Sequence, residues 1–249
     1  MSPILDKKQM TEEDIKFNYI TPALSEKGWQ DKITMETKVF FTDGKINLRG
    51  NLVTRKKPKK ADYILHVNAD RPIAIVEAKD NKHQIADGIQ QAMEYAEMMD
   101  IPFAYSSNGD GFYEHDFLTG QERELSLSSF LTPDELLERF ETGAHGGQGR
   151  SDAERGLEKQ PFYSSATTWP PRYYQRKAVN RVVDAIARGQ QRLLLVMATG
   201  TGKTYTAFQI VYRLLKSGMK NKVLSMELEA IQILLHYGRL LYQNIIPLF

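Results

Sequence analysis

Helical and strand-like spacings of apolar residues alternate along the first part of the chain. Apolar side chains recur every three to four residues over residues 83–99, which is the spacing of one helix face. The helices predicted in this way span residues 11–25, 83–99 and 131–140. Short alternating or continuous apolar runs predict strands at residues 33–41, 61–67, 72–78, 103–106 and 111–117. This succession predicts an α/β domain, which we assign to residues 1–142.

The two strands at residues 61–67 and 72–78 are separated by turn residues, among them Asn68 and Asp70. A turn at this point pairs the strands as an antiparallel hairpin, in which the numbers of paired residues sum to about 139. Asp62, at the start of the first strand, is then expected to lie opposite Glu77, near the end of the second.

The pattern changes at residue 141. Residues 141–160 contain several glycines and many charges without apolar periodicity, so we expect a linker or exposed loop, assigned to residues 143–168. Further helices are predicted at residues 172–188 and 203–217, on either side of a continuous apolar run at residues 192–197. Such a run is typical of a buried strand in a parallel sheet. Residues 169–249 are therefore expected to form a second, parallel α/β domain.

Composition narrows the class of protein. The 249 residues include no cysteine, which excludes disulfide scaffolds, thiolate metal sites and a cysteine nucleophile. The 33 basic and 31 acidic residues give a net charge of +2, so any nucleic-acid contact has to come from a local cluster of charge. The charged N-terminus lacks the apolar core of a secretory signal, and residues 231–249 carry too many polar groups for a membrane span. The expectation is a cytoplasmic protein without membrane contact.

Two carboxylates and a lysine meet at the predicted hairpin. Glu77 and Lys79 are two residues apart at a strand end and therefore point to one face, with Asp62 opposite. Neighbouring carboxylates repel each other unless a cation lies between them, and their oxygens, with the carbonyl of Ala78, suit Mg²⁺. Bound Mg²⁺ polarises a phosphate and lowers the pKa of water, while Lys79 stabilises negative charge in the transition state. A surface ion pair between Glu77 and Lys79 is the alternative interpretation.

Gln91 and Tyr95 are four residues apart on the predicted helix 83–99 and therefore share one of its faces. The pattern D-(x)n-ExK followed by Q-x-x-x-Y resembles the RecB-like branch of the PD-(D/E)xK nucleases. The resemblance implies a mixed-sheet nuclease domain in which the metal is held by Asp62, Glu77 and Ala78. It also implies a catalytic group made of Asp62, Glu77, Lys79, Gln91 and Tyr95.

A basic run precedes the strand that carries Asp62. It consists of Arg55, Lys56, Lys57, Lys59 and Lys60. Each cation that neutralises a phosphate releases counterions and so strengthens binding to DNA. Because the run lies next to the predicted phosphodiester site, we interpret it as a contact with the DNA backbone. A solvated loop is the alternative. Glu12, Glu13 and Glu36 could add a metal ligand, but solvent-facing carboxylates are the favoured interpretation for them.

A glycine-rich segment, MATGTGKT, joins a predicted strand to a predicted helix. This is the context that a phosphate-binding loop requires. Backbone N–H groups around Gly200, Thr201 and Gly202 are expected to surround phosphates at the helix N-terminus. Lys203 reaches the β- and γ-phosphates, and the Thr204 hydroxyl binds Mg²⁺.

Met197 stands where the strict loop pattern has its first glycine, and the segment resembles the loop of superfamily 2 helicases and translocases. Gln175, in the sequence RYYQ, resembles the adenine-reading element of those motors. The whole arrangement over residues 1–224 resembles the N-terminal part of the motor (R) subunit of type I restriction enzymes. That resemblance implies double-stranded DNA as substrate, Mg²⁺ and ATP as cofactors, and modification and specificity subunits as partners.

The chain departs from the motor family after Thr204. No carboxylate pair of the Walker B type follows, and the residues after about 224 do not match the motor, although residues 231–249 can form an apolar helix face. We therefore expect an incomplete, truncated RecA-like domain that binds ATP weakly and does not hydrolyse it. Two alternatives to a nuclease remain: a non-catalytic remnant that binds DNA or partner subunits, and a free-standing nucleotide-binding protein.

Overall fold

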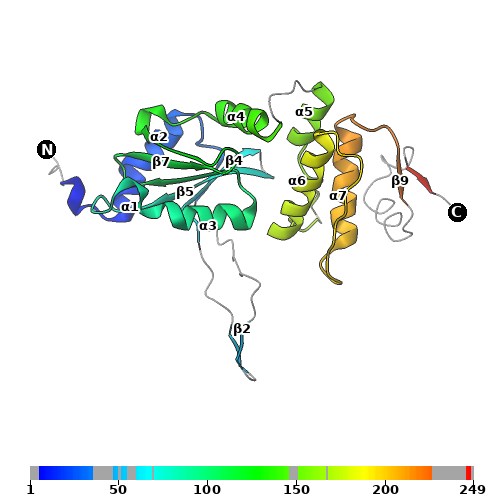
Figure 1. Ribbon diagram of the computed structural model, residues 1–249, viewed down its shortest axis with the longest axis horizontal. Helices are drawn as coiled ribbons and strands as arrows, with labels where there is room; N and C mark the ends of the chain where they lie inside the picture. Colours follow the sequence, from blue (N-terminus) through cyan, green and yellow to red (C-terminus); the bar gives the residue numbers. More distant parts are fainter. Residues whose placement is uncertain are drawn as a thin grey trace. The chain divides into compact units, whose positions relative to one another are not determined.

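The computed structural model describes residues 6–35, 47–49, 52–54, 60–68, 70–145, 151–166, 168–225 and 245–247. The chain divides into two compact units, Met1–Gly146 and Gly147–Phe249, and each is described by itself. The first unit is a mixed α/β fold, as the sequence predicts (Figure 1).

The first unit begins with a nearly continuous helical segment. After the short 3-10 turn η1 (Lys7–Gln9) come α1 (Glu12–Ile15), the π-helical turn η2 (Lys16–Ile20) and α2 (Thr21–Glu26). The side chains of Thr11 and Asp14 form a reciprocal capping box at the start, which confirms the predicted helix there. Pro22 does not end the helix. Because proline removes one backbone donor and crowds the preceding turn, the widened η2 turn lies directly before it.

A six-stranded sheet forms the centre of the first unit, in the order β1-β4-β5-β6-β7-β8. Its strands are β1 (Ile33–Met35), β4 (Tyr63–Asn68), β5 (Arg71–Ala78), β6 (Phe103–Ser107), β7 (Gly111–Asp116) and β8 (Gln121–Ser126). β5 and β6 are parallel, and the other neighbouring strands are antiparallel. The sequence did not predict β8, because its side chains are almost all polar and exposed.

The β4–β5 hairpin has the predicted register. Tyr63 pairs with Val76 and Leu65 pairs with Ala74, and both pairs of residue numbers sum to 139. An irregularity follows between Leu65 and His66, where a bulge increases the local twist of the strand. The register places the residues before Tyr63 beside those after Val76.

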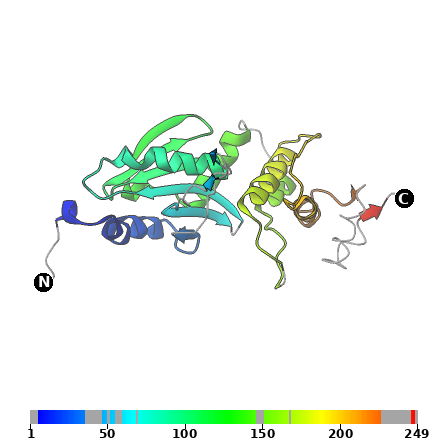
Figure 2. The ribbon, with the colours of Figure 1, turned by 90° about the horizontal axis from the view of Figure 1, so that it is seen from below.

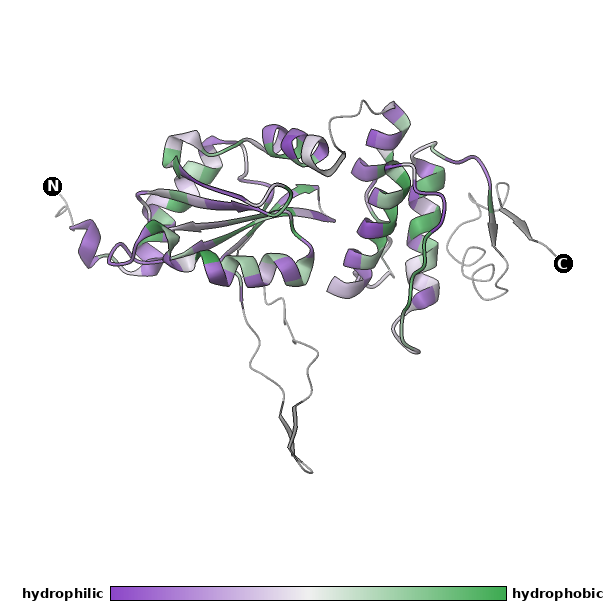
Figure 3. Ribbon diagram, in the orientation of Figure 1, coloured by the Kyte–Doolittle hydropathy of each residue, from purple (hydrophilic) through white to green (hydrophobic). Residues whose placement is uncertain are grey.

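Helices cover both faces of the sheet (Figures 1 and 2). On one face η3 (Ile85–Gly88) leads into α3 (Ile89–Met99), whose Ala92, Tyr95 and Ala96 pack in a buried cluster with Ile64 and Ile75. On the other face α1, η2, α2 and α4 (Pro133–His145) cover a larger apolar core. That core includes Ile15, Leu24, Trp29, Tyr63, Val76, Phe103, Tyr105, Phe112 and Leu136. Figure 3 shows apolar colouring concentrated on the strands and on the helix faces turned toward them.

The second unit consists mainly of three helices, α5 (Asp152–Lys159), α6 (Tyr173–Ala187) and α7 (Lys203–Lys216). The helices predicted for α6 and α7 are confirmed. The expectation of a linker or exposed loop is wrong over Asp152–Lys159, which form α5. Ser151 caps α5, and Leu157 is buried against Val179 and Leu214. The buried guanidinium of Arg213 donates hydrogen bonds to the carbonyls of Leu157 and Glu158. A single apolar anchor and these backbone contacts hold a helix whose sequence is otherwise polar.

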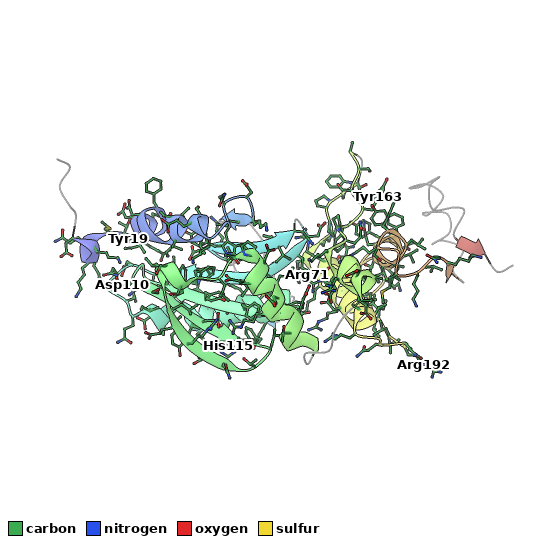
Figure 4. All side chains as sticks on the ribbon, turned by 90° about the horizontal axis from the view of Figure 1, so that it is seen from above. Tyr19, Arg71, Asp110, His115, Tyr163 and Arg192 are labelled. Carbon is green, nitrogen blue, oxygen red and sulfur yellow. The ribbon has the colours of Figure 1, made fainter. Side chains whose placement is uncertain are left out.

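The predicted buried strand at residues 192–197 is also wrong. The segment forms no strand among the described residues, and Leu194 and Val196 are 91% and 82% exposed. Figure 4 places Arg192 at the periphery of the unit. A continuous apolar run is buried only when neighbouring strands flank it, and the part of the unit that the structure describes supplies none. Among the described residues, this segment therefore belongs to no sheet.

Two further pairs of short strands complete the described structure. β2 (Asn47–Arg49) pairs antiparallel with β3 (Leu52–Thr54), and β9 (Val223–Ser225) pairs parallel with β10 (Ile245–Pro247). The apolar helix predicted at residues 231–249 is wrong for residues 245–247, which form the strand β10. Residues 226–244 lie outside the described part.

In the first unit, a 3-10 turn, η4 (Leu127–Ser129), follows β8. Within the described ranges, each helix is too short or too polar to cross a membrane.

Candidate active site

The β4–β5 hairpin brings Asp62 and Glu77 together. Both residues lie directly beyond the pair Tyr63–Val76 in the ladder. The amide of Ala78 donates a hydrogen bond of 2.8 Å to Oδ2 of Asp62. This bond fixes the Asp62 carboxylate against the end of β5, in the neighbourhood that the sequence predicts.

Glu77 is a buried carboxylate with one unused oxygen. Only 3% of its surface is exposed. The Gln91 side-chain amide donates a hydrogen bond to Oε1, whereas Oε2 is buried without a hydrogen-bond partner. Burial, and then repulsion from Asp62, raise the pKa of Glu77 to about 8. The site therefore contains a buried carboxylate oxygen that accepts no hydrogen bond from the described residues.

Lys79 and the α3 helix complete this group. Nζ of Lys79 lies 3.5 Å from Oε1 of Glu77 and 3.4 Å from Oε1 of Gln91. Gln91 also donates from Nε2 to the hydroxyl of Tyr95 over 3.1 Å, because the two residues are one helical turn apart. The structure thus brings the five residues that the sequence singled out for catalysis into one site at the ends of β4, β5 and α3.

Two small residues, not identified from the sequence, let α3 approach the carboxylates. A Cβ atom on Gly88 would stand 3.1 Å from Cβ of Ser106 and 3.4 Å from Cγ of Glu77. Ser106 pairs with Glu77 across β5 and β6, and its hydroxyl donates to the carbonyl of Ile85. The sequence did contain a signal for this contact, namely Gly88. A glycine inside a helical pattern indicates that another part of the backbone or a side chain approaches closely.

Lys16 is a third residue that the sequence did not indicate. Its ammonium nitrogen lies 2.5 Å from Oδ1 of Asp62, 2.9 Å from Glu12 and 3.0 Å from Glu13. Both glutamates were expected to face solvent. Glu12 is half-buried and Glu13 is exposed, and both are paired with this lysine. The N-terminal helix therefore contributes charge to the site.

The chemistry of the site fits a divalent cation. Asp62 and Glu77 supply carboxylate oxygens and Ala78 can supply a carbonyl, which is a hard ligand set of the kind that Mg²⁺ prefers. The unpartnered Oε2 of Glu77 supports this fit. Within the described ranges, no cluster of three or more acidic, cysteine or histidine side chains is arranged to hold a metal ion.

A second group of candidate residues lies in the other unit, at the start of α7. Gly200 and Gly202 adopt φ values of +77° and +83°, which glycine reaches without strain. The helix begins at Lys203, whose side chain is exposed, with Thr204 next to it. The loop therefore leads into a helix N-terminus that carries an exposed lysine, and such a terminus favours anions.

Gln175 connects α6 to this loop. Its Nε2 donates to the carbonyl of Thr201 over 2.9 Å, and its Oε1 accepts from the amide of Arg172. A pocket of about 270 Å³ lies beside this contact. Its lining consists of Trp169, Pro170, Arg172, Tyr174, Gln175, Gly200, Thr201, Gly202 and Tyr205. The pocket thus brings together Gln175 and the predicted loop residues Gly200, Thr201 and Gly202. Lys203 and Thr204, which were also predicted to contact the nucleotide, are not among its lining residues.

The predicted DNA-contacting run is only partly described. Arg55, Lys56, Lys57 and Lys59 lie outside the described residues, as does Glu36. Lys60 is described and exposed. It directly precedes the segment that carries Asp62.

Comparisons with known proteins match two segments of the chain, and these segments contain the two groups of residues. Residues 31–101 match the family described as the type I restriction enzyme EcoKI endonuclease subunit, second domain, and residues 168–230 match the type III restriction enzyme res subunit. The type I restriction enzyme EcoAI endonuclease subunit of Escherichia coli is 40% identical over 224 residues. The chain resembles the N-terminal part of type I restriction endonuclease (HsdR) subunits.

Two further HsdR relatives support this. The EcoKI endonuclease subunit of Escherichia coli strain K12 is 29% identical over 66% of the chain. A solved fragment described as an HsdR subunit from Vibrio vulnificus YJ016 superposes with a TM-score of 0.72 and 41% identity over 84% of the chain. The chain covers 27% of the EcoAI subunit, 17% of the EcoKI subunit and 38% of the Vibrio fragment. It therefore spans about a quarter or less of the curated HsdR subunits it matches.

Proposed function

We propose that the first unit is a Mg²⁺-dependent endonuclease domain that hydrolyses phosphodiester bonds of double-stranded DNA as part of a type I restriction endonuclease subunit. The observation that carries the proposal is the pair Asp62 and Glu77, in which Glu77 has a buried oxygen without a partner beside a fixed neighbouring carboxylate. Burying such an oxygen is costly unless a cation or donor completes it in the working state.

Each side chain of the site has a distinct task in this proposal. Asp62, Glu77 and the carbonyl of Ala78 hold the ion, which when bound polarises the phosphate and lowers the pKa of a water molecule. Lys79 places positive charge beside the phosphate, where negative charge develops during hydrolysis. Gln91 orients the Glu77 carboxylate through its amide, and Tyr95 holds Gln91 in place.

The basic run before Asp62 extends the proposal to DNA binding. Lys60 and the four basic residues that precede it adjoin the carboxylates in the chain. Their charges would neutralise backbone phosphates near the scissile bond, independently of sequence. In this proposal a specificity subunit, and not this chain, recognises the particular DNA sequence. The chain works in a cytoplasmic complex with that specificity subunit and a modification subunit.

We further propose that the second unit binds ATP. The observation that favours this is the turn at Gly200 and Gly202, which leads into α7 and borders the pocket with Gln175. ATP hydrolysis is not assigned to this chain, because the residues that would position water at the γ-phosphate were not found in its sequence.

Metal binding tests the nuclease proposal directly. Isothermal titration of the full chain with Mn²⁺ should show binding that is lost in Asp62→Asn and in Glu77→Gln, because each change replaces a charged oxygen ligand. With the partner subunits and DNA present, both variants and Lys79→Met should lose cleavage by about 10²-fold or more. Lys82→Met is the matched control, because Lys82 is an exposed lysine three residues beyond Lys79.

The same experiment separates the nuclease from a non-catalytic remnant. A remnant would bind DNA but would give no Mn²⁺ signal that depends on Asp62 or Glu77. Cleavage above about a tenth of the normal rate in either carboxylate variant would also contradict the proposed site.

A further inference from the structure

Lys16 is a buried lysine whose ammonium group lies among three carboxylates. Its side chain is 6% exposed, and its nitrogen contacts Glu12, Glu13 and Asp62 at 2.9, 3.0 and 2.5 Å. A buried ammonium group is stable only when charged partners replace its hydration. Two of those partners belong to its own helix, but Asp62 lies 46 residues away, in the candidate active site.

The helix is built to deliver this lysine. Thr11 and Asp14 fix the first turn, which carries Glu12 and Glu13. Lys16 is the first residue of the π-helical turn η2. Single π turns inside α-helices are frequent at functional sites. Glu12 and Glu13, one helical turn earlier, contact the same ammonium group that reaches Asp62.

The contact of Lys16 involves the oxygen of Asp62 that accepts no bond from Ala78. Oδ2 of Asp62 already accepts from the amide of Ala78, so Oδ1 is the oxygen with more lone-pair capacity for a further ligand. Oδ1 is the atom that Lys16 contacts. Across the hairpin Glu77 has the opposite state, because its Oε2 is without a partner. Lys16 therefore pairs with one oxygen of Asp62, whereas one oxygen of Glu77 has no hydrogen-bond partner among the described residues.

We propose that Lys16 is the resident cation of the site, and that a divalent ion displaces it from Asp62 on binding. The inference rests on the proposed nuclease function. In the metal-free chain the ammonium group neutralises Asp62 and reduces its repulsion of Glu77. With a divalent ion bound, Lys16 would leave Oδ1 of Asp62, while Glu12 and Glu13 would keep their negative charge on the N-terminal helix. The segment α1–η2 therefore responds to metal occupancy.

Lysine labelling of the unaltered chain tests the displacement. An amine-acetylating reagent, followed by mass spectrometry, should modify Lys16 slowly without metal and at least about tenfold faster with saturating Mn²⁺, since the nitrogen loses its contact with Asp62 and becomes accessible. Lys7 is the internal control. It lies in the same unit, is ion-paired with Asp110 at 2.6 Å and contacts the ring of Tyr19, and its rate should not change. Figure 4 shows Tyr19 and Asp110 at one end of the unit.

A pair of variants tests the competition. Lys16→Met keeps the aliphatic stem and removes the charge, so Mn²⁺ should bind the full chain about tenfold more tightly or better. Lys7→Met removes a paired lysine elsewhere and should bind as the unaltered chain does. If Lys16→Met does not fold without metal, the labelling result alone decides.

The outcomes distinguish this inference from the function on which it rests. If the unaltered chain binds Mn²⁺ and Lys16 stays protected, or if Lys16→Met binds no more tightly, Lys16 is a structural ion pair and the inference is wrong. If neither the unaltered chain nor Lys16→Met binds Mn²⁺, the metal site itself is overturned, and the inference with it.

Discussion

Gly88 lies so close to Glu77 that a Cβ atom at position 88 would stand 3.4 Å from Cγ of the glutamate. The same atom would be 3.1 Å from Cβ of Ser106, on the neighbouring strand. Both neighbours belong to buried strands and have little freedom to move. Gly88 therefore sets the distance between α3 and the carboxylates, and with it the contact of Gln91 with Glu77.

We predict that Gly88→Val lowers cleavage by about 10²-fold, since a displacement of reacting groups by about 1 Å can have an effect of this size. The branched side chain would push the start of α3 away from Glu77 and weaken the Gln91 contact. Cleavage and Mn²⁺ affinity should be measured together with thermal unfolding. Gly156→Val is the matched control, because a Cβ there meets only the carbonyl of Ser217 at 3.8 Å. Normal cleavage in Gly88→Val would contradict the proposed spacing.

The raised pKa of Glu77 predicts a pH-dependent stability in the absence of metal. Burial and then Asp62 raise this pKa from 4.5 to about 8. Between these values the folded chain holds a proton that the unfolded chain releases. The contribution of Glu77 to stability is therefore complete below about 4.5 and is lost as the pH rises through about 8. Glu77→Gln should flatten this dependence.

Urea unfolding in the presence of a chelator, repeated across that pH range, measures the effect. Asp62 supplies part of the repulsion, so Asp62→Asn should make the dependence weaker without removing it. Two results would show that Glu77 is already charged in the folded state. One is a free energy of unfolding that stays constant from pH 5 to 8, and the other is a Glu77→Gln variant whose free energy of unfolding changes with pH as it does in the unaltered chain.

The carboxylate pair was predictable from the sequence because its geometry is local. Turn residues set the register of one hairpin, and that register alone places Asp62 beside Glu77. The pairing of Gln91 with Tyr95 follows in the same way from the period of one helix. Lys16 was not predictable, because its contact with Asp62 depends on how α1 and η2 pack on the sheet.

The errors in the second unit have a different cause. The run of leucines near Leu194 predicted burial, but apolar side chains are buried only where other elements cover them, and Leu194 is 91% exposed. The segment of α5 was predicted to be an exposed loop, but it forms a packed helix. Its sequence is polar apart from Leu157, and the helix depends on contacts with α6 and α7 that no local pattern reveals.

The basic run before Asp62 predicts a salt-dependent, sequence-independent affinity for DNA. Replacement of Lys56, Lys57 and Lys59 by glutamine should weaken binding equally for unrelated duplexes. It should reduce the slope of log K against log salt by about one for each phosphate that is no longer neutralised. Fluorescence anisotropy at several salt concentrations measures the slope. The control removes three exposed lysines of the second unit, Lys216, Lys220 and Lys222. Equal slopes in the two triple variants would identify the run as a solvated loop.

The pocket beside Gln175 predicts an optical signal for nucleotide binding. Trp169 lines that pocket and is 87% exposed, whereas the other tryptophan, Trp29, is fully buried in the first unit. An adenine base that enters the pocket should cover Trp169 and shift its fluorescence to shorter wavelength, while Trp29 contributes a constant background. The shift should disappear in Trp169→Phe and weaken in Lys203→Ala, which removes the charge nearest the phosphates. Calorimetric binding of ATP that leaves the fluorescence of Trp169 unchanged would place the base elsewhere, and a full shift in Lys203→Ala would contradict the role of the glycine-rich loop.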